Sequence, residues 1–347
     1  MKRVRLGKTG LEVSRIGFGG IPIQRLNEAE AVRVVARCLE LGVNFLDTAT
    51  GYSTSEERIG KAIAGRRQGL VLATKSPARD AGTATAHIDQ SLRRLGVEVL
   101  DLWQLHNVST MEALDRVLAP GGALEAGRRA VEAGKVRHVG ITSHSMEVAL
   151  KAVPMGCFET VQFPFNFVTS EPAERLLPLA REHDVGFIAM KPLGGGLLSN
   201  ARLCLKWLLQ YDVVPDPGIE RVAEIEEIVS IVDGMVEGDP ALTPEEWAEI
   251  ERIRADVGTR FCRRCGYCEP CPEGVRVSAL MTLESMIKRL PVERVISPSG
   301  WVAPAVASAA GCIECGECEE KCPYQLPIRE MMAEHLALYE RIVQAAG

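Results

Sequence analysis

The chain has 347 residues and a formal net charge of −6, and 46% of its residues are hydrophobic. This length suits one large domain or two smaller ones with sizeable cores, and the acidic balance excludes a basic surface of the kind that binds nucleic acid. The N-terminal segment lacks the apolar stretch of a secretory signal, and no apolar run approaches the roughly 18–20 residues of a membrane helix. We therefore expect a cytoplasmic protein that binds neither nucleic acid nor membranes.

Residues 3–13 predict a small β-hairpin, because polar and apolar residues alternate around a turn that contains two glycines. Eight apolar runs with β character follow, and each stops at a polar residue, a glycine or a proline. The runs stop at Gly19, Asp47, Lys75, His106, Thr142, Pro164, Lys191 and Pro215. Helical patterns alternate with them over residues 28–41, 55–64, 85–95, 124–133, 146–152, 173–183, 198–210 and 222–232.

This repeat predicts an α/β fold, a closed (β/α)8 TIM barrel that follows the N-terminal hairpin. A doubly wound open sheet is the alternative. The glycines of the first strand, Gly17-Phe18-Gly19-Gly20, do not have the GxGxxG spacing of a dinucleotide-binding turn, which weakens that alternative.

Three polar residues stand at the ends of consecutive strands: Asp47, Lys75 and His106. Tyr52 follows in the loop after the second strand. Taken alone, Asp47 could cap a helix and Tyr52 could be ordinary packing. Barrel enzymes carry their active sites at the C-terminal ends of the strands, so three such residues in register beside a tyrosine favour a catalytic site.

These four side chains make an electrophilic pocket. A phenol has a pKa of about 10, a nearby ammonium lowers it, and a carboxylate holds the ammonium in place. An imidazole can hydrogen-bond to a substrate oxygen, so the group can polarise and protonate a carbonyl. No side chain supplies a hydride, which implies a nicotinamide cofactor.

Asp47, Tyr52, Lys75 and His106 resemble the Asp-Tyr-Lys-His tetrad of the aldo-keto reductases. The resemblance extends over about residues 3–255. It includes five short sequence segments: Arg5-Leu6-Gly7-Lys8-Thr9-Gly10-Leu11, Asn44-Phe45-Leu46-Asp47-Thr48-Ala49, Ala73-Thr74-Lys75, Gln104-Leu105-His106 and Gly140-Ile141-Thr142-Ser143. It implies that Tyr52 is the proton donor, that Lys75 lowers the pKa of Tyr52, that Asp47 holds Lys75 and that His106 orients the carbonyl. It implies an aldehyde, a ketone or an alcohol as substrate, whose identity the loops do not reveal.

The same resemblance implies a set of nucleotide contacts. Ser143 and Gln162 would hold the carboxamide, His144 stands where the family usually has Asn, and Met190 stands where an aromatic residue often stacks on the nicotinamide. The pyrophosphate segment would contain Lys191, Leu193, Gly194, Gly195 and Gly196, and the adenosine end would meet Gly218, Arg221 and Glu227. Gly218, Glu224 and Ile228 replace the family's usual Lys, Arg and Asn, which weakens the case for NADPH. The site then favours NADH, or binds either cofactor weakly.

Eight of the eleven cysteines form two tight groups after residue 260: Cys262, Cys265, Cys268 and Cys271, and Cys312, Cys315, Cys318 and Cys322. The second group has the C-x2-C-x2-C-x3-C-P spacing of bacterial iron–sulfur proteins, and the first is one residue shorter. Two zinc ions are the alternative, but zinc sites usually pair CxxC motifs across a longer loop. We expect two 4Fe–4S clusters.

This part of the chain resembles the helical two-cluster ferredoxin module. The resemblance implies crossed ligand sets, in which Cys322 joins the first three cysteines and Cys271 joins Cys312, Cys315 and Cys318. Helices are predicted over residues 244–255, 278–290 and 328–343, and the domains are expected to be 1–256, the barrel, and 257–347, the ferredoxin-type domain.

Two classes of function follow. The first is an NAD(P)H-dependent carbonyl reductase with clusters that are structural or relay electrons. The second is an electron-transfer protein with a redox partner, in which the barrel is a docking or sensory platform; the intact tetrad argues against it. A hydride carries two electrons and a cubane carries one, and no flavin motif is present to connect them, which favours a structural role or a further cofactor or partner.

Overall fold

The computed structural model describes residues 1–236, 241–288, 290–300 and 302–346. The chain divides into two compact units, Met1–Leu242 and Thr243–Gly347. Within the described ranges, none of the helices combines the length and the apolar character needed to span a membrane.

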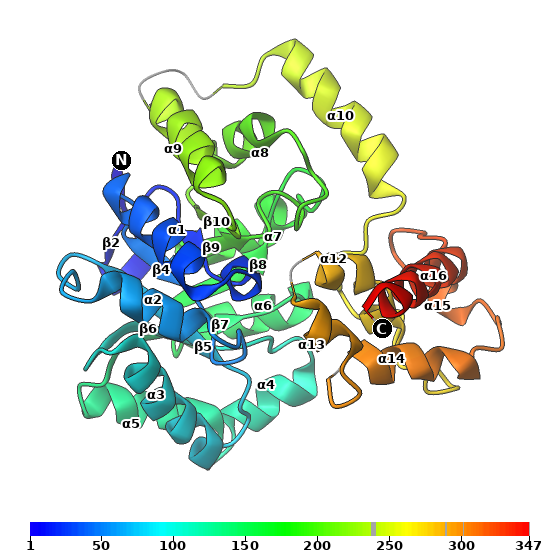
Figure 1. The fold of residues 1–347 in the computed structure, drawn as a ribbon, viewed down its shortest axis with the longest axis horizontal. Helices are drawn as coiled ribbons and strands as arrows, with labels where there is room; N and C mark the ends of the chain where they lie inside the picture. Colours follow the sequence, from blue (N-terminus) through cyan, green and yellow to red (C-terminus); the bar gives the residue numbers. More distant parts are fainter. Residues whose placement is uncertain (237–240, 289, 301, 347) are drawn as a thin grey trace. The chain divides into compact units, whose positions relative to one another are not determined.

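The first unit is a barrel of eight parallel strands with helices around it (Figure 1). Each strand pairs with the next one along the chain. The ring closes between the first and last strands, where Gly19 forms a parallel bridge with Gly218 and its amide donates to the Pro217 carbonyl. The predicted (β/α)8 barrel is confirmed.

The barrel strands are short, and most of their side chains are buried on both faces. They are β3 (Phe18–Gly19), β4 (Phe45–Asp47), β5 (Val71–Ser76), β6 (Leu100–Leu105), β7 (Val136–Thr142), β8 (Thr160–Pro164), β9 (Gly186–Met190) and β10 (Val214–Asp216). The helices that follow them are α1 (Glu28–Glu40), α2 (Ser55–Ile63), α3 (Ala81–Leu95), α4 (Met111–Leu118), α5 (Ala123–Glu132), α6 (Met146–Ala152), α7 (Pro172–Glu182), α8 (Ala201–Leu208) and α9 (Val222–Val236).

Polar residues at the helix N-termini explain where several of these helices begin. Asn27 and Glu30 form a reciprocal capping box at the start of α1, and Asp80 accepts a hydrogen bond from the Thr83 amide at the start of α3. Thr110 caps α4 in the same way. The sequence pattern predicts no helix over these residues, so α4 is an addition to the predicted repeat.

The predicted hairpin is present as β1 (Arg3–Arg5) and β2 (Glu12–Ser14), which pair antiparallel. Leu6 and Val13 are buried against Phe45 and other side chains inside the barrel. The hairpin therefore contributes apolar side chains to the barrel core beside the first residue of β4, while the opposite ends of the strands carry the polar residues.

The second unit is helical. Its elements are α10 (Pro244–Gly258), α11 (Val277–Leu280), α12 (Leu283–Ile287), α13 (Val292–Ile296), α14 (Val302–Ser308), α15 (Glu317–Glu320) and α16 (Ile328–Ala346). The compact unit thus begins before α10, whereas the sequence assigned this helix to the barrel domain; the boundary at residues 256 and 257 stays a prediction.

The single helix predicted over residues 278–290 is wrong. The structure has two short helices there, α11 and α12, separated by a turn at Met281 and Thr282. The Thr282 hydroxyl donates to the carbonyls of Ser278 and Ala279. Such a bond competes with the helical ladder, and the Thr282 amide pairs only three residues back, with Ala279.

Candidate active site and cysteine clusters

The four tetrad residues meet at the C-terminal ends of three neighbouring strands. Asp47 is the last residue of β4, Lys75 is near the end of β5, and His106 follows β6. Tyr52 lies in the turn between β4 and α2, where its amide donates to the Ala49 carbonyl. The strand ends named from the sequence therefore lie at one edge of the barrel.

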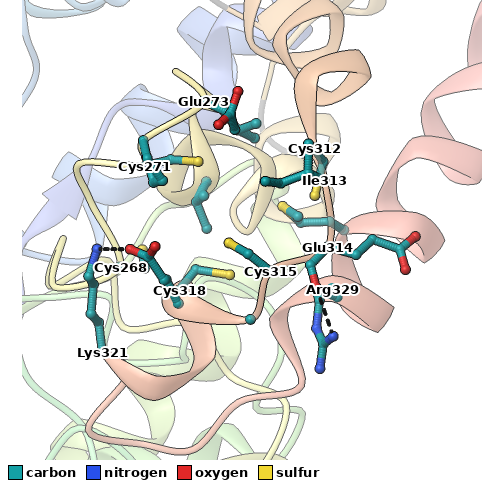
Figure 2. Close-up of a pocket in the computed structure, with 16 residues that line it drawn as sticks. Cys268, Cys271, Glu273, Cys312, Ile313, Glu314, Cys315, Cys318, Lys321 and Arg329 are labelled. Atoms are coloured by element: carbon teal, nitrogen blue, oxygen red, sulfur yellow. Dashed lines mark hydrogen bonds and ion pairs between the residues drawn. The ribbon is translucent and has the colours of Figure 1, made fainter.

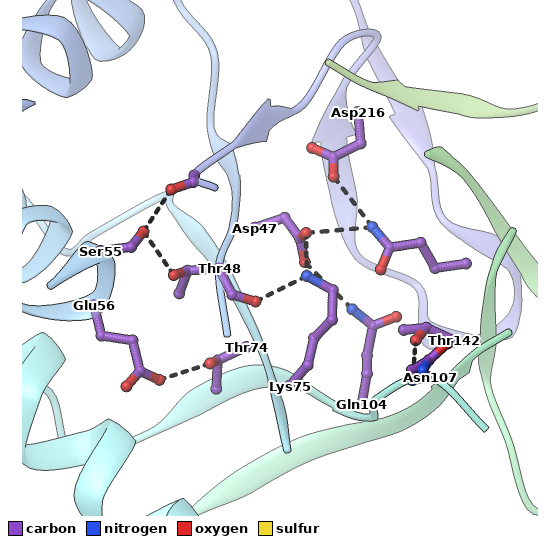
Figure 3. Close-up of polar contacts among 12 residues, drawn as sticks. Asp47, Thr48, Ser55, Glu56, Thr74, Lys75, Gln104, Asn107, Thr142 and Asp216 are labelled. Atoms are coloured by element: carbon purple, nitrogen blue, oxygen red, sulfur yellow. Dashed lines mark hydrogen bonds and ion pairs between the residues drawn. The ribbon is translucent and has the colours of Figure 1, made fainter. Parts of the chain in front are cut away.

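Asp47 and Lys75 form an ion pair inside the barrel (Figure 3). The Lys75 ammonium donates to Asp47 Oδ2 and, at 2.8 Å, to the carbonyl of Thr48. Their side chains are only 4% and 3% exposed. Burial acts most strongly on Lys75 and lowers its pKa, but Asp47, Tyr52 and Asp216 together raise the pKa above the ordinary value for lysine. These neighbours therefore favour the ammonium form of Lys75, and little water screens its charge.

Tyr52 and His106 complete the group. Lys75 Nζ lies 5.1 Å from the centroid of the Tyr52 ring. The rings of Tyr52 and His106 meet edge to face, with centroids 5.7 Å apart. The turn that carries Tyr52 is fixed to the barrel, because the Ser53 hydroxyl donates to Gln24 Oε1 at 3.0 Å.

Two buried amides also bind Asp47. Gln104 Nε2 donates to Asp47 Oδ1 at 3.3 Å, and Gln162 Nε2 donates to Asp47 Oδ2 at 3.2 Å. Both Gln oxygens are buried and lack a hydrogen-bond partner among the described residues. Gln104 is a site residue that the sequence pattern does not single out; its position in β6, two residues before His106, is the signal that identifies it.

Asp216 is the other residue that sequence reasoning missed. It ends β10 and is 6% exposed, and Figure 3 shows it among the polar residues around Asp47. Gln162 Nε2 donates to Asp216 Oδ2 at 3.1 Å, so one nitrogen contacts both Asp216 and Asp47. Burial raises the pKa of Asp216 well above its usual range, and the negative charge of Asp47 adds to the rise.

The residues expected to hold a nucleotide lie at the same end of the barrel. Ser143 follows β7 and is buried, Gln162 is in β8, and Met190 ends β9. His144 follows Ser143, and its Nδ1 lies 3.1 Å from Asn107 Oδ1. Gly218 lies two residues after the end of β10.

The segment after β9 has an unusual backbone. Lys191 has φ of 55°, and Gly194, Gly195 and Gly196 have φ values of 58°, 74° and 93°. The amides of Gly194 and Gly196 donate within this segment, to the carbonyls of Lys191 and Leu193, both at 2.9 Å. Only glycine adopts such left-handed conformations without strain. Among the residues predicted to meet the adenosine, Arg221 is exposed and donates to Glu224 at 2.8 Å, and Glu227 is exposed on α9.

In the second unit, the two cysteine motifs repeat one backbone conformation. The residues on both sides of the middle cysteine have positive φ in each: Arg264 (62°) and Gly266 (82°) around Cys265, and Glu314 (57°) and Gly316 (84°) around Cys315. Each motif therefore has the same turn around its middle cysteine.

The cysteine side chains gather in two sets. Cys271, Cys312, Cys315 and Cys318 line one pocket, which Cys268 also borders, and Figure 2 shows the sulfur atoms of the first four around a common space. No set of three or more His, Cys, Asp or Glu side chains in the described residues is arranged around a single metal ion.

The other set is identified by its mutual electrostatic influence. Burial raises the pKa of Cys268 to about 12, and the charges of Cys262 and Cys265 add to this rise. Burial also raises the pKa of Cys265, with a contribution from Cys322. Cys322 thus lies near the first motif, and Cys271 lies near the second.

The aldo/keto reductase family profile matches residues 15–203, more than half of the 347 residues. The chain belongs to the aldo/keto reductase family. A second profile, for a 4Fe-4S dicluster domain, matches residues 261–326. The chain is therefore an oxidoreductase whose aldo/keto reductase barrel is fused to a C-terminal 4Fe–4S domain, and both resemblances noted in the sequence are confirmed.

Two relatives illustrate the relationship. The chain is 30% identical over 217 residues to the uncharacterized oxidoreductase YqkF of Bacillus subtilis (strain 168), covering 58% of this chain and 68% of that protein. It is 26% identical over 290 residues to probable aldo-keto reductase 1 of Glycine max, covering 65% of this chain and 82% of that protein.

Solved structures show the same barrel. The holo form of aldo-keto reductase AKR11C1 from Bacillus halodurans has a TM-score of 0.63 and 28% identity, over 73% of this chain and 96% of that chain. An aldo/keto reductase from Klebsiella pneumoniae, in complex with NADP and acetate, has a TM-score of 0.61 and 24% identity, over 73% of this chain and 95% of that chain.

Proposed function

We propose that the barrel reduces an aldehyde or ketone to an alcohol, or catalyses the reverse reaction, with NADH or NADPH as the hydride carrier. The arrangement of Lys75 is the observation that supports this most directly. Its ammonium is bonded to Asp47 and faces the Tyr52 ring at 5.1 Å, and Tyr52 meets His106. A phenol between an ammonium and an imidazole is suited to exchange a proton with a carbonyl oxygen.

In this proposal Tyr52 donates its proton to the carbonyl oxygen as the carbonyl carbon receives hydride. Lys75 stabilises the phenolate that remains, and Asp47 keeps Lys75 in place. His106 orients the carbonyl oxygen by a hydrogen bond. A bound reduced nicotinamide would supply the hydride.

The residues at the barrel mouth fit a nicotinamide nucleotide. Gln162 uses its nitrogen for the two carboxyl groups, so its buried oxygen is the atom that remains to accept a hydrogen bond from a carboxamide. Gly194, Gly195 and Gly196 carry no side chains, which allows a pyrophosphate to approach the backbone closely. The Klebsiella pneumoniae relative was solved with NADP, which is consistent with this assignment.

The adenosine end offers little positive charge for a 2′-phosphate. Arg221 is the basic residue expected there, and Glu224 already pairs with it. We therefore expect NADH to bind at least as tightly as NADPH, or both to bind weakly.

We further propose that the second unit binds two 4Fe–4S clusters with crossed ligands. Cys262, Cys265, Cys268 and Cys322 would hold one, and Cys271, Cys312, Cys315 and Cys318 would hold the other. The shared cavity of the second set and the repeated left-handed backbone of both motifs support this pairing. A bound cluster would exchange single electrons.

The test is turnover by the protein purified without oxygen. NADH and NADPH oxidation is measured with a panel of aldehydes and ketones, and compared with Tyr52→Phe. We expect kcat to fall by about 10²–10⁴ in the variant, while the dissociation constant of the nucleotide changes little. Full activity in Tyr52→Phe would refute the role of Tyr52 as proton donor. The metal content of the same protein is also measured, and zinc in place of iron would refute the assignment of 4Fe–4S clusters.

An electron-transfer protein is the second candidate, favoured by one observation: Cys315 is exposed at the surface of the second unit. An exposed ligand would bring a cluster within reach of a redox partner protein. An electron-transfer function is supported if neither NADH nor NADPH binds at millimolar concentration and the clusters still exchange electrons with an external donor.

A further inference from the structure

Two buried carboxyl groups share one buried cation at the C-terminal ends of the barrel strands. Asp47 and Asp216 are both buried, and the Lys75 ammonium is the cation that accompanies them. Carboxylates that share a buried site compete for one counter-charge, so one of them retains a proton to higher pH than usual. Asp47 pairs directly with Lys75, which makes Asp216 the group that retains the proton.

The contacts connect Asp216 to Tyr52 in three steps. Asp216 and Asp47 bind the same nitrogen of Gln162, at 3.1 and 3.2 Å. Asp47 binds Lys75, and Lys75 lies 5.1 Å from the Tyr52 ring centroid. Asp47, Lys75, Gln162 and Asp216 are all at least nine-tenths buried, so little water screens a charge that appears on Asp216.

We propose that Asp216 is a positioning residue of the tetrad, whose ionisation, transmitted through Asp47 and Lys75, sets the pH at which Tyr52 releases its proton. This rests on the proposed role of Tyr52 as the acid of carbonyl reduction. Asp216 touches neither substrate nor nicotinamide in this role; it changes the charge that Lys75 presents to the phenol.

Few other groups around Asp216 could change its ionisation. Gly17 precedes β3, and an added Cβ there would lie 3.0 Å from Asp216 Oδ1. On β9 the paired residue is Met190, and on β8 the contact is Gln162; none of these three ionises. Asp47 of β4 and Lys75 of β5 are the charged groups that act on Asp216.

The sign follows from the charges. An ionised Asp216 adds a negative charge near Lys75, which makes a phenolate at Tyr52 less favourable and raises the pH at which it forms. Asp216→Asn is nearly isosteric, can still accept a hydrogen bond from Gln162, and never acquires the charge. Tyr52 in this variant therefore loses its proton at lower pH, by about one unit, a tenfold change in proton affinity.

The titration is measured by 19F NMR on the full chain with 3-fluorotyrosine at its five tyrosines, with the Tyr52 signal assigned by its loss in Tyr52→Phe. Asp216→Asn should move the Tyr52 midpoint down by about one unit. Asp101→Asn is the control: Asp101 is a buried carboxylate at the start of β6, paired with Arg67 and Arg137, and should leave the midpoint unchanged. If Asp216→Asn does not fold, Asp216→Thr gives the same comparison.

A midpoint that is unchanged or higher in Asp216→Asn overturns the proposal, whatever the catalytic activity. Where turnover is present, the pH at which kcat for reduction declines should fall by the same amount, measured with a deuterated nicotinamide to show that hydride transfer limits the rate. A shifted midpoint without any turnover supports the coupling and refutes the proposed reductase function, so the two failures are distinguishable.

Discussion

Asp47 accepts hydrogen bonds from Lys75, Gln104 and Gln162, and Lys75 alone brings a positive charge. Removing two charges from water costs several kcal/mol for each ion, and the attraction between them often no more than offsets it. A buried pair of this kind is therefore weak evidence for stability. Its position beneath Tyr52 is better explained by the charge that it presents to the phenol.

Lys75→Met should destabilise the barrel by about 3–5 kcal/mol, because it leaves the Asp47 carboxylate buried without a counter-charge. The double variant Asp47→Asn with Lys75→Met should recover most of this loss, although both proteins should lack reductase activity. The free energy of unfolding by denaturant, followed through the buried tryptophans Trp103 and Trp207, measures the effect.

The matched control is Lys61→Met, which breaks an exposed pair with Glu28. Exposed pairs contribute about 0–1 kcal/mol, so this variant should unfold close to the wild type. If Lys75→Met lowers the free energy of unfolding no more than Lys61→Met does, the other partners of Asp47 compensate its charge. The expected cost of removing Lys75 is then wrong.

At the scale of elements, the sequence pattern predicted the order of strands and the residues at their ends. The pattern succeeded because each buried barrel strand is an apolar run in the sequence. The run stops where a polar side chain lies at the C-terminal end of the strand. The pattern located Asp47, Lys75 and His106 in this way. It did not show that Gln104 and Gln162 bind Asp47, because two amides within apolar strands resemble packing residues until the strands are placed side by side.

Asp216 was missed because Pro215 looked like the end of the last strand. Proline lacks a backbone N–H and usually marks the edge of a sheet. In the structure β10 continues through Pro215, whose carbonyl accepts from the Gly17 amide at 2.8 Å as the ring closes. Barrel closure is a property of the whole sheet, so a local pattern could not reveal that Asp216 is interior.

The close packing of β7 on β8 allows a test at Gly140. A Cβ at this position would lie 2.1 Å from Thr160 Oγ1 and 3.1 Å from the side chain of Gln104. Gly140→Ala should therefore destabilise the barrel by about 1–3 kcal/mol, measured as the free energy of unfolding. Removing the nearest atom with Thr160→Ala should make the double variant more stable than the sum of the two single effects.

Gly234→Ala is the control for this change. Gly234 is in α9, and nothing lies within 4 Å of an added Cβ. Alanine is favoured over glycine inside a helix by about 0.5–1 kcal/mol, so this variant should be slightly more stable. Equal stability of Gly140→Ala and the wild type would show that the two strands move apart without cost.

At the scale of the whole molecule, the two units are built from different cores. The barrel core consists of apolar side chains from many strands and helices. In the second unit, Cys268 and Cys322 belong to the core, and Cys262, Cys271, Cys312 and Cys318 pack against it. Its helices α11, α12 and α13 have only four or five residues, too few to be stable by themselves.

Loss of iron should therefore unfold the second unit and leave the barrel intact. When metal ligation holds a small core together, the binding free energy is part of the folding free energy. Hydrogen exchange followed by mass spectrometry should show fast exchange over residues 261–326 after anaerobic chelation, with unchanged protection in the barrel strands. Cys312→Ser should give the same pattern with reduced iron content, whereas Cys157→Ser, outside both motifs, should keep full iron and full protection. Protection that persists over residues 261–326 without iron would show that the apolar residues around Leu280 and Met332 suffice to fold this unit.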